Sequence, residues 1–267
     1  MDDEPDYKIY RAFIAPCENM PLTEVLPDTP GYYMFDDFKA YHCLAAFSSG
    51  KQDLGFQNNP NLRKNRSQFL QKLAIPSREL VCLQQVHGNN VFVATKKDKG
   101  HGAYDYALAI PGYDGIITAE PQLPLAVFTA DCLSVFMLDT EKRVAAVLHS
   151  GWRGTRDNIV GVTLDIMSSK FSSRVENIIC GLGPGIRSCC YEVGTEFKGY
   201  FSQGLLKRKG KIFLDLARTN LSQLRGAGIK PEHLYDCGIC TCCRRDFFSY
   251  RRDGQAAGRM MSVIMLE

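Results

Sequence analysis

The segment AVLHSGWRGT, residues 146–155, places a histidine, two glycines, an arginine and the only tryptophan of the chain close together. His149 ends an apolar stretch, and Arg153 follows where we expect the chain to turn from a strand into a helix. Gly151 and Gly154 allow a sharp turn and a close backbone approach to a ligand. Arg153 and the N–H groups of the first helical turn could therefore hold an anion beside His149.

Two more side chains could join His149 in one site. His87 follows the apolar segment LVCLQQV, and Cys132 lies in the corner TADCLS between two apolar segments. Two imidazoles and one thiolate, with a fourth position left to water, are a typical ligand set of a catalytic zinc site. Such an ion lowers the pKa of its water toward about 7. Asp131 is the candidate for orienting the imidazoles.

The spacing of these residues leaves other interpretations open. Cys132 could be a small buried apolar residue and the histidines ordinary hydrogen-bonding groups. Alternatively, Cys132 could be the nucleophile of a metal-free cysteine hydrolase, with His87 or His149 as its base. Copper-dependent oxidation of phenols is less favoured, because it needs several copper ions and the chain has five histidines. Copper could still replace zinc in vitro, because its intrinsic affinity is higher.

A second cluster of cysteines occurs in CGICTCCRRD, which contains Cys237, Cys240, Cys242 and Cys243. It could bind a second metal ion, be redox-active or simply pack in the interior. Cys189-Cys190 is the nearest candidate for a second pair of metal ligands. This pair lies in the loop GLGPGIRSCCYEV, which could also form a wall of the site.

The elements that must position these residues are mainly short apolar strands. We expect strands over 41–47, 114–119, 125–130, 134–138, 144–149 and at the start of 177–186, and two around a turn over 80–95. Strands this apolar are usually covered on both faces. Helices are predicted over 61–73, 153–171 and 214–229, the second with Thr155 as N-cap. The tail from 247 is predicted to form a short strand, a loop and a final strand.

Because consecutive strands outnumber helices, we predict an α+β fold: a single domain with a mixed sheet flanked by helices. Residues 1–40 are expected to be an irregular N-terminal arm, and residues 41–267 the catalytic domain. On one face of the helix over 61–73, apolar side chains should gather, namely Leu62, Phe69, Leu70 and Leu73.

Composition narrows the class of protein. The formal net charge of +3 is too small to indicate binding to nucleic acid or a membrane surface. The sequence has no apolar run near the roughly 20 residues that a membrane span requires. Eleven cysteines without an export signal indicate free thiols in a reducing compartment, so we expect a cytoplasmic protein, monomeric or homodimeric.

Seven motifs in the same order resemble the YfiH, or laccase-domain, family: QVHGNNV, DGIIT, LAVFTADCLSVFMLD, AAVLHSGWRGT, GLGPGI, YEVG and FFSYRRDG followed by GR. The resemblance implies a zinc triad of His87, Cys132 and His149. It further implies phosphorolysis of adenosine, inosine and methylthioadenosine, together with adenosine deamination. Its small-molecule partners would be a purine nucleoside and phosphate.

The same resemblance also implies that Arg66, in the pair Asn65-Arg66, is a second anion or substrate contact beside Arg153. Older names of the family imply a copper polyphenol oxidase. This chain departs from the family where AFSSGKQDLG, residues 46–55, replaces a stretch of the form STRxGGxS. The rim of the site, and with it the substrate preference, is where we expect this chain to differ.

Overall fold

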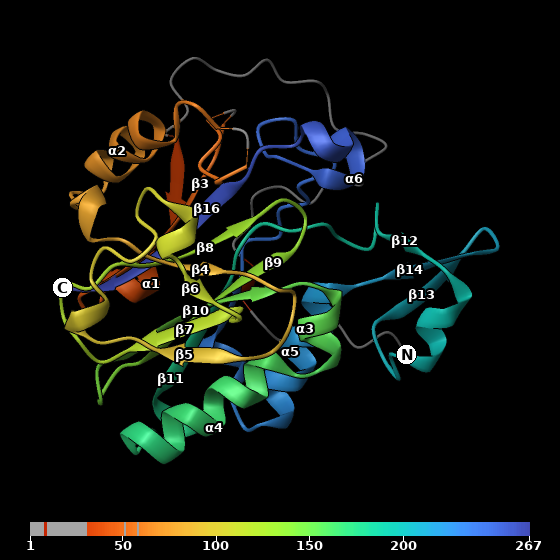
Figure 1. The fold of residues 1–267 in the computed structure, drawn as a ribbon. Coiled ribbons are helices and arrows are strands. Elements are labelled where there is room, and N and C mark those ends of the chain that lie inside the picture. Colours follow the sequence, from red (N-terminus) through yellow and green to blue (C-terminus); the bar gives the residue numbers. More distant parts are fainter. Residues whose placement is uncertain (1–7, 10–30, 51, 58) are drawn as a thin grey trace.

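The computed structural model describes residues 8–9, 31–50, 52–57 and 59–267. Within them the strands form three sheets (Figure 1). Most of the expected arm, residues 1–40, lies outside the described residues. Its described part contains β1 (Lys8–Ile9), β2 (Tyr32–Met34) and α1 (Asp36–Lys39). Since β2 pairs with a strand of the main body, residues 31–39 belong to the fold.

The largest sheet is mixed and has the order β1-β15-β11-β9-β10-β7-β5. Its central strands β11, β9, β10 and β7 pair antiparallel, whereas β5 pairs parallel with β7 and β15 parallel with β11. The bounds are β5 (Val91–Val93), β7 (Gly115–Thr118), β9 (Leu133–Asp139), β10 (Val144–Ser150), β11 (Ile178–Leu182) and β15 (Leu234–Asp236).

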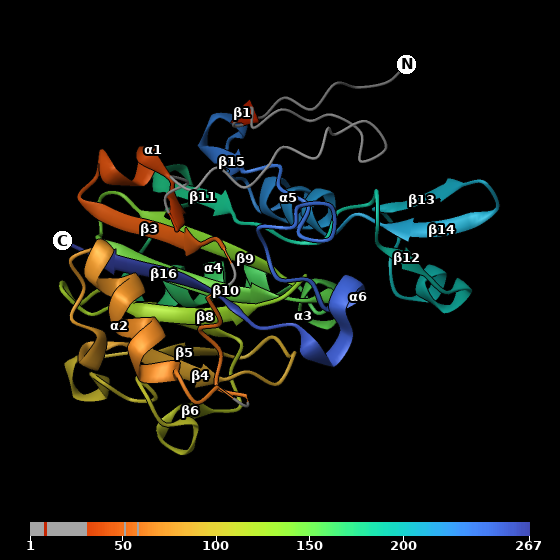
Figure 2. The same cartoon turned by 90° about the horizontal axis from the view of Figure 1, so that it is seen from above.

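A second sheet has the order β2-β3-β16-β8-β4-β6, with β3 (Cys43–Ser48), β4 (Val81–Gln84), β6 (Ile110–Pro111), β8 (Leu125–Thr129) and β16 (Met260–Leu266). A small third sheet contains β12 (Glu192–Val193), β13 (Leu205–Arg208) and β14 (Lys211–Leu214). It projects from the end of the molecule where α3 (Trp152–Arg156) and α6 (Tyr250–Asp253) lie (Figures 1 and 2).

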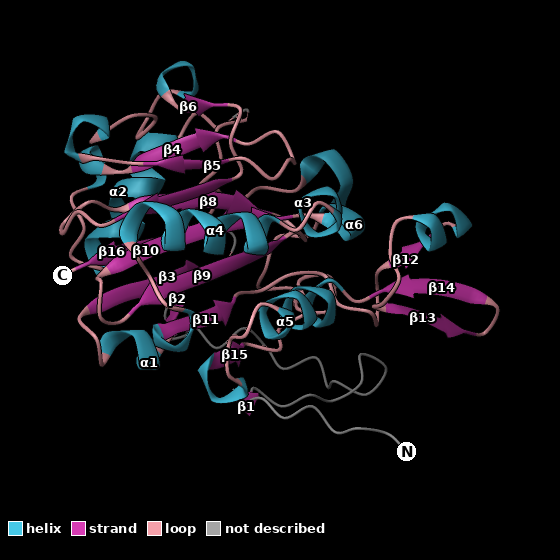
Figure 3. Cartoon of the chain, turned by 90° about the horizontal axis from the view of Figure 1, so that it is seen from below, coloured by secondary structure: helices cyan, strands magenta, loops and turns pink. Residues whose placement is uncertain are grey.

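The two large sheets pack face to face, and helices cover their outer faces. Phe136 of the first sheet and Ile264 of the second belong to the core between them. The helices α4 (Ile159–Phe171) and α5 (Leu216–Gly226) pack on the outer face of the first sheet (Figure 3). α2 (Leu62–Lys72) packs on the second. This confirms the α+β class, and β8, β9 and β10 are buried along their whole length, as their apolar sequences predict.

On α2, the predicted apolar face is buried at Phe69, Leu70 and Leu73, while Leu62 is half-buried at its start. The other short helical segments include η2 (Ser77–Glu79), η3 (Lys96–Asp98), η4 (Tyr106–Leu108), η5 (Val175–Asn177), η6 (Thr195–Gly199), η7 (Pro231–His233) and η8 (Gly254–Ala256). Among the described residues, no helix combines the length and the apolar character needed to cross a membrane.

Three sequence predictions are wrong. The helix expected over 153–171 is divided into α3 (Trp152–Arg156) and α4, because Asn158 takes a left-handed conformation with φ of 55° and caps α4 with its side chain. Thr155 is not an N-cap, since its buried hydroxyl lies 3.0 Å from the Ser150 hydroxyl. The strand expected from 247 is instead a loop followed by α6 (Tyr250–Asp253), which Ser249 caps.

Candidate functional site

The structure brings His87, Cys132 and His149 together at the end of the large sheets. One ligand atom from each residue lies within 4.8 Å of the others. His149 is on β10, Cys132 is in the turn between β8 and β9, and His87 is in the turn that follows β4. The two imidazole rings have their centroids 4.7 Å apart and are almost perpendicular, at 83°. Side chains from three distant segments therefore converge on one point.

Asp114, which directly precedes β7, fixes two of the three. Its Oδ1 atom lies 2.7 Å from Nδ1 of His149, so Nε2 is the nitrogen of that ring that could bind a metal ion. The same carboxylate accepts hydrogen bonds from the backbone N–H groups of Val86, His87 and Gly88. Asp114 thus orients one imidazole and holds the turn that carries the other.

The expected orienting residue, Asp131, has another role. Its carboxylate accepts hydrogen bonds from the Thr241 hydroxyl at 2.6 Å and from the Arg251 backbone N–H at 2.6 Å, not from an imidazole. Asp131 therefore connects the turn that carries Cys132 to the loop that contains Thr241 and to α6, which contains Arg251. The sequence signal for Asp114 was available in DGIIT, where an acidic residue adjoins a buried strand.

The electrostatics of the site favour a thiolate. Burial raises the pKa of the Cys132 thiol, but the charge of His149 and hydrogen bonds from His149 and His87 lower it to about 6. For His149, burial lowers the pKa, while Cys132 and Asp114 raise it to about 9. The thiolate is the form of cysteine that binds metal ions and acts as a nucleophile.

The backbone around these ligands is tightly constrained. His87 and Asp131 have φ values of 62° and 91°, a left-handed conformation that costs a residue other than glycine about 1–3 kcal/mol. At Gly151, a Cβ atom would lie 2.9 Å from the Cys132 sulfur. At Gly154, it would lie 2.8 Å from the backbone oxygen of Gly88. The two glycines of the GWRG segment are therefore needed for close packing around the ligands.

His87, Cys132 and His149 line a cleft with a volume of about 710 Å³. Aromatic residues form much of its lining: Phe56, Tyr106, Phe128, Trp152, Tyr191 and Tyr250. Ile186 and Tyr191 come from the glycine-rich loop after β11, which therefore forms a wall of the cleft, as expected from the sequence. An apolar, aromatic cleft with a few polar groups is typical of a site for a small organic molecule.

The cations in this lining are ones that the sequence reasoning missed. Arg251 and Arg259 line the cleft. Arg251 lies over the Tyr191 ring, with its guanidinium carbon 5.2 Å from the ring centroid. Both residues belong to the last motif, FFSYRRDG followed by GR, whose spacing contains no indication of which arginine faces the cleft.

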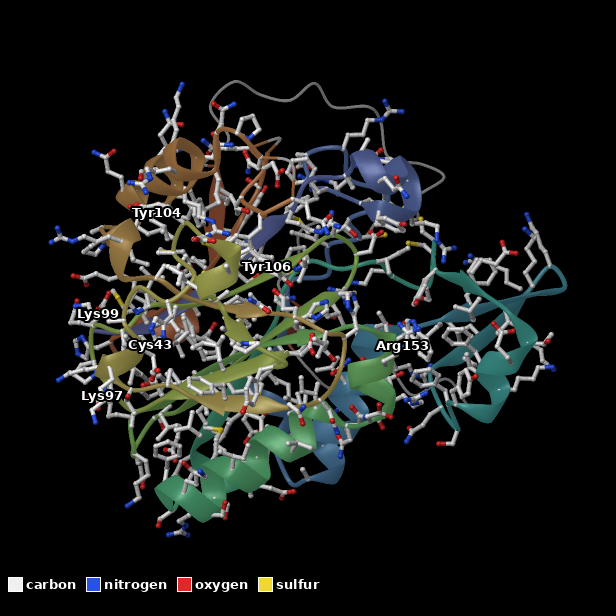
Figure 4. All side chains as sticks on the ribbon, in the orientation of Figure 1. Cys43, Lys97, Lys99, Tyr104, Tyr106 and Arg153 are labelled. Carbon is white, nitrogen blue, oxygen red and sulfur yellow. The ribbon has the colours of Figure 1, made fainter. Side chains whose placement is uncertain are left out.

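Arg153 is exposed on α3, near the small third sheet, and its guanidinium carbon lies 4.4 Å from the centroid of the Trp152 ring (Figure 4). It is not part of the cleft lining, although Trp152 is. Tyr106, which also lines the cleft, comes from η4 (Figure 4).

Arg66 differs from the expectation of a substrate contact, because it is fully buried behind the cleft wall. Its guanidinium carbon lies 4.1 Å from the Phe56 ring centroid and 4.5 Å from that of Phe128. It donates hydrogen bonds to the backbone oxygens of Leu54, Gly102 and Ala103. Because no part of Arg66 reaches the surface, its position supports a structural role in holding the aromatic wall.

The donor set of His87, Cys132 and His149 fits a metal ion. Two imidazole nitrogens and one thiolate sulfur suit zinc and copper better than magnesium or calcium, which prefer oxygen. The Asp114–His149 hydrogen bond is the outer contact typical of a metal-ligating histidine. His42, His101 and His233, the remaining histidines, belong to no group of potential metal ligands among the described residues.

Comparisons with known proteins show which proteins this chain resembles. Residues 48–267 match a family described as multi-copper polyphenol oxidoreductase laccase. A purine nucleoside phosphorylase of Geobacillus stearothermophilus is 34% identical over 75% of this chain and 77% of its own length. Another from Clostridium acetobutylicum is 32% identical over 87% of this chain and 96% of its own. A protein named as an adenosine deaminase, from an unknown prokaryote, is 29% identical over 72% of this chain and 77% of its own.

Among solved structures, a YfiH protein of Bacillus licheniformis has a TM-score of 0.85 at 28% identity, covering 90% of this chain and 98% of its own. The likeness thus extends over most of the fold as well as the sequence. The chain belongs to the YfiH-type family described as multi-copper polyphenol oxidoreductase laccase.

Proposed function

We propose that this chain is a zinc-dependent purine nucleoside phosphorylase that also deaminates adenosine. The observation that carries the proposal is the convergence of His87, Cys132 and His149 in a cleft walled by aromatic rings. The names of the phosphorylase and deaminase relatives support the substrate class. Oxidation of phenols by several copper ions is less well supported, because the described residues group only two histidines and one cysteine there.

The cleft suits the parts of a purine nucleoside. A purine base is flat and stacks favourably on rings such as those of Phe128 and Tyr191. The guanidinium groups of Arg251 and Arg259 offer charge-assisted hydrogen bonds to phosphate. Arg153 would add to the positive charge near the rim without lining the cleft.

In phosphorolysis, a phosphate oxygen forms a bond to C1′ of the ribose while the bond from C1′ to the purine breaks. The products are ribose 1-phosphate and the free base, which takes up a proton. The arginines would place the phosphate, and the aromatic wall would hold the base while the bond breaks. When bound by His87, Cys132 and His149, a zinc ion supplies Lewis acidity for polarising the base or activating water.

Deamination uses the same cleft with water in place of phosphate. Water adds to C6 of adenosine and ammonia leaves, so that inosine is formed. Asp114 would serve both reactions by keeping the His149 ring oriented. Of the ten cysteines among the described residues, nine are free and Cys243 is disulfide-bonded, a majority that supports our proposal of a reducing, cytoplasmic location.

The test is to incubate zinc-loaded protein with inosine, adenosine and methylthioadenosine, with and without phosphate, and to separate the products by chromatography. We expect at least one of the three nucleosides to release its free base only when phosphate is present. Inosine should form from adenosine without phosphate. Cys132→Ser should abolish both, whereas Cys242→Ser, a thiol outside the cleft lining, should not. No turnover by zinc-loaded protein, or activity unaffected by Cys132→Ser, would overturn the proposal.

A further inference from the structure

Four sulfur atoms from two distant loops converge at a second place in the molecule. Cys189 and Cys190 precede β12, while Cys240 and Cys243 follow β15, and their sulfurs all lie within 4.8 Å of one another. The Sγ atom of Cys243 is 3.6 Å from that of Cys189 and 3.4 Å from that of Cys190. We call these four residues the sulfur cluster.

We propose that the sulfur cluster, in its reduced form, binds a second zinc ion in a closed site. Four thiolates at the usual Zn–S distance form a tetrahedron whose edges are about 3.8 Å long. The sulfur separations of 3.4 and 3.6 Å lie close to this value. A set of four sulfurs leaves no position for water, so the ion would stabilise structure and take no part in catalysis.

The backbone builds both halves of this site. Cys240 forms a parallel β-bridge with Gly185, which joins the two loops. The N–H of Arg244 donates to the carbonyl of Cys240, so that the turn brings residues 240 and 243 to the same side. In the other loop, the N–H of Cys190 donates to the carbonyl of Arg187. Backbone hydrogen bonds therefore hold the two loops together at the place where the four sulfurs converge.

The same geometry separates the sulfur cluster from the neighbouring cysteines. The sulfur of Cys237 faces the Arg187 guanidinium, at 3.9 Å, and Cys242 packs against the core beneath the outer helices. Neither belongs to the group of converging sulfurs. Of the sequence cluster 237–243, only Cys240 and Cys243 thus remain as ligands, and Cys189-Cys190 supplies the second pair.

Nearby positive charge suits a site of this kind. Four thiolates around a divalent zinc ion carry a net charge of −2, which needs compensation. The Arg208 guanidinium donates a hydrogen bond to the carbonyl of Cys189. The Arg252 guanidinium donates to the carbonyl of Cys242, between the two ligands of the second loop.

The oxidation state of Cys243 controls the site. Cys189, Cys190 and Cys240 are free thiols, whereas Cys243 is disulfide-bonded. Two molecules of a thiol reductant such as glutathione reduce that disulfide to two thiols and become one oxidised disulfide themselves. The four cysteines of the reduced cluster then lose their thiol protons when they bind the ion.

A zinc ion in the sulfur cluster would hold one wall of the cleft in place. Tyr191, next to Cys190, lines the cleft. Thr241, next to Cys240, donates to the carboxylate of Asp131, which precedes the ligand Cys132. Loss of the second ion should therefore loosen this wall without removing a ligand of the first site.

The experiment counts metal ions per chain by plasma mass spectrometry, on protein purified with a phosphine reductant. Two zinc ions are expected for the natural chain and for the control Cys242→Ser. One is expected for Cys190→Ser and for Cys240→Ser, and also for Cys132→Ser, which removes the first site instead. Cys190→Ser and Cys240→Ser variants that bind as many zinc ions as the natural chain would overturn the proposal, whereas a natural chain whose single ion is lost in Cys190→Ser but kept in Cys132→Ser would overturn only the first site.

An absorption spectrum of cobalt-substituted protein tests the second site even if Cys190→Ser and Cys240→Ser do not fold. With cobalt in place of zinc, Cys132→Ser should keep the intense near-ultraviolet absorption that thiolate–cobalt charge transfer produces. Without the reductant, that absorption should be lost, because Cys243 is then oxidised. A Cys132→Ser protein that shows no thiolate absorption after full reduction contradicts the second site, whether or not the enzymatic proposal holds.

Discussion

The Nδ1 atom of His149 lies 2.7 Å from the Oδ1 atom of Asp114, deep in the protein where neither side chain is more than 3% exposed. The same carboxylate also accepts the backbone N–H of His87 at 2.9 Å. One acidic group therefore positions two of the three proposed metal ligands. Its buried charge is balanced by the hydrogen bonds that it accepts.

This relationship predicts the effect of Asp114→Asn. An asparagine keeps the size of the side chain but has no charge and only one oxygen to accept the hydrogen bonds from the turn. Zinc affinity should fall about 10- to 100-fold, as is typical when the outer partner of a ligating histidine is lost. Competition with a coloured chelator measures the change. Asp165→Asn, exposed on α4, is the control and should bind zinc like the natural chain; equal affinities for both variants would refute the role of Asp114.

Gly151→Ala is predicted to disrupt the same site by steric contact. The added methyl group would meet the Cys132 sulfur at 2.9 Å and the His87 ring at 3.6 Å. Overpacking of this kind costs about 1–3 kcal/mol in stability and should displace the thiolate. Zinc should therefore raise the melting temperature less in this variant than in the natural chain. The matched control is Gly226→Ala, where a Cβ meets open space; an undiminished zinc effect at residue 151 would count against the packing argument.

Sequence patterns predicted much of this fold because the buried strands consist largely of apolar residues. The apolar segments over 125–130, 134–138 and 144–149 correspond to β8, β9 and β10, each buried throughout. The break between α3 and α4 was not predicted, because an asparagine such as Asn158 can also continue a helix. Tertiary contacts determine that the helix is divided at this residue. Among these contacts are the hydrogen bonds of Thr155 with Ser150 and Asn220.

In the candidate site, the types of the residues identified the potential metal ligands, but their positions in the sequence did not show which residue orients them. His87, Cys132 and His149 were recognisable as potential metal ligands because few other side chains bind zinc. Which aspartate orients His149 depends on which strand lies beside β10, the strand that carries His149. That neighbour is β7, which Asp114 directly precedes, and not β8, which ends before Asp131. The burial of Arg66 was not predicted either, because a charged residue on a helix is usually exposed.

Arg66→Ala tests the structural role of that buried side chain. The change removes three hydrogen bonds to backbone oxygens and the cation that lies over the rings of Phe56 and Phe128. Each buried oxygen left without a donor costs about 1–3 kcal/mol, so the midpoint of urea unfolding should fall markedly. Arg63→Ala, on the exposed side of α2, should change it little. A direct phosphate contact would instead raise the KM for phosphate in a variant of normal stability.

Arg251→Gln tests the proposed phosphate contact. The backbone N–H of residue 251 still reaches Asp131 in this variant, so α6 should keep its position while the cleft loses one positive charge. A hydrogen bond to a charged group contributes about 1.5–3 kcal/mol, which corresponds to a rise of about 10- to 100-fold in the KM for phosphate. The KM for inosine should stay nearly constant, because a neutral nucleoside does not need the charge.

Arg245→Gln removes an exposed arginine outside the cleft lining and should leave both constants unchanged. Steady-state kinetics with each substrate varied in turn distinguishes the two sites of binding, and a selective loss of inosine affinity in Arg251→Gln would assign this arginine to the nucleoside instead.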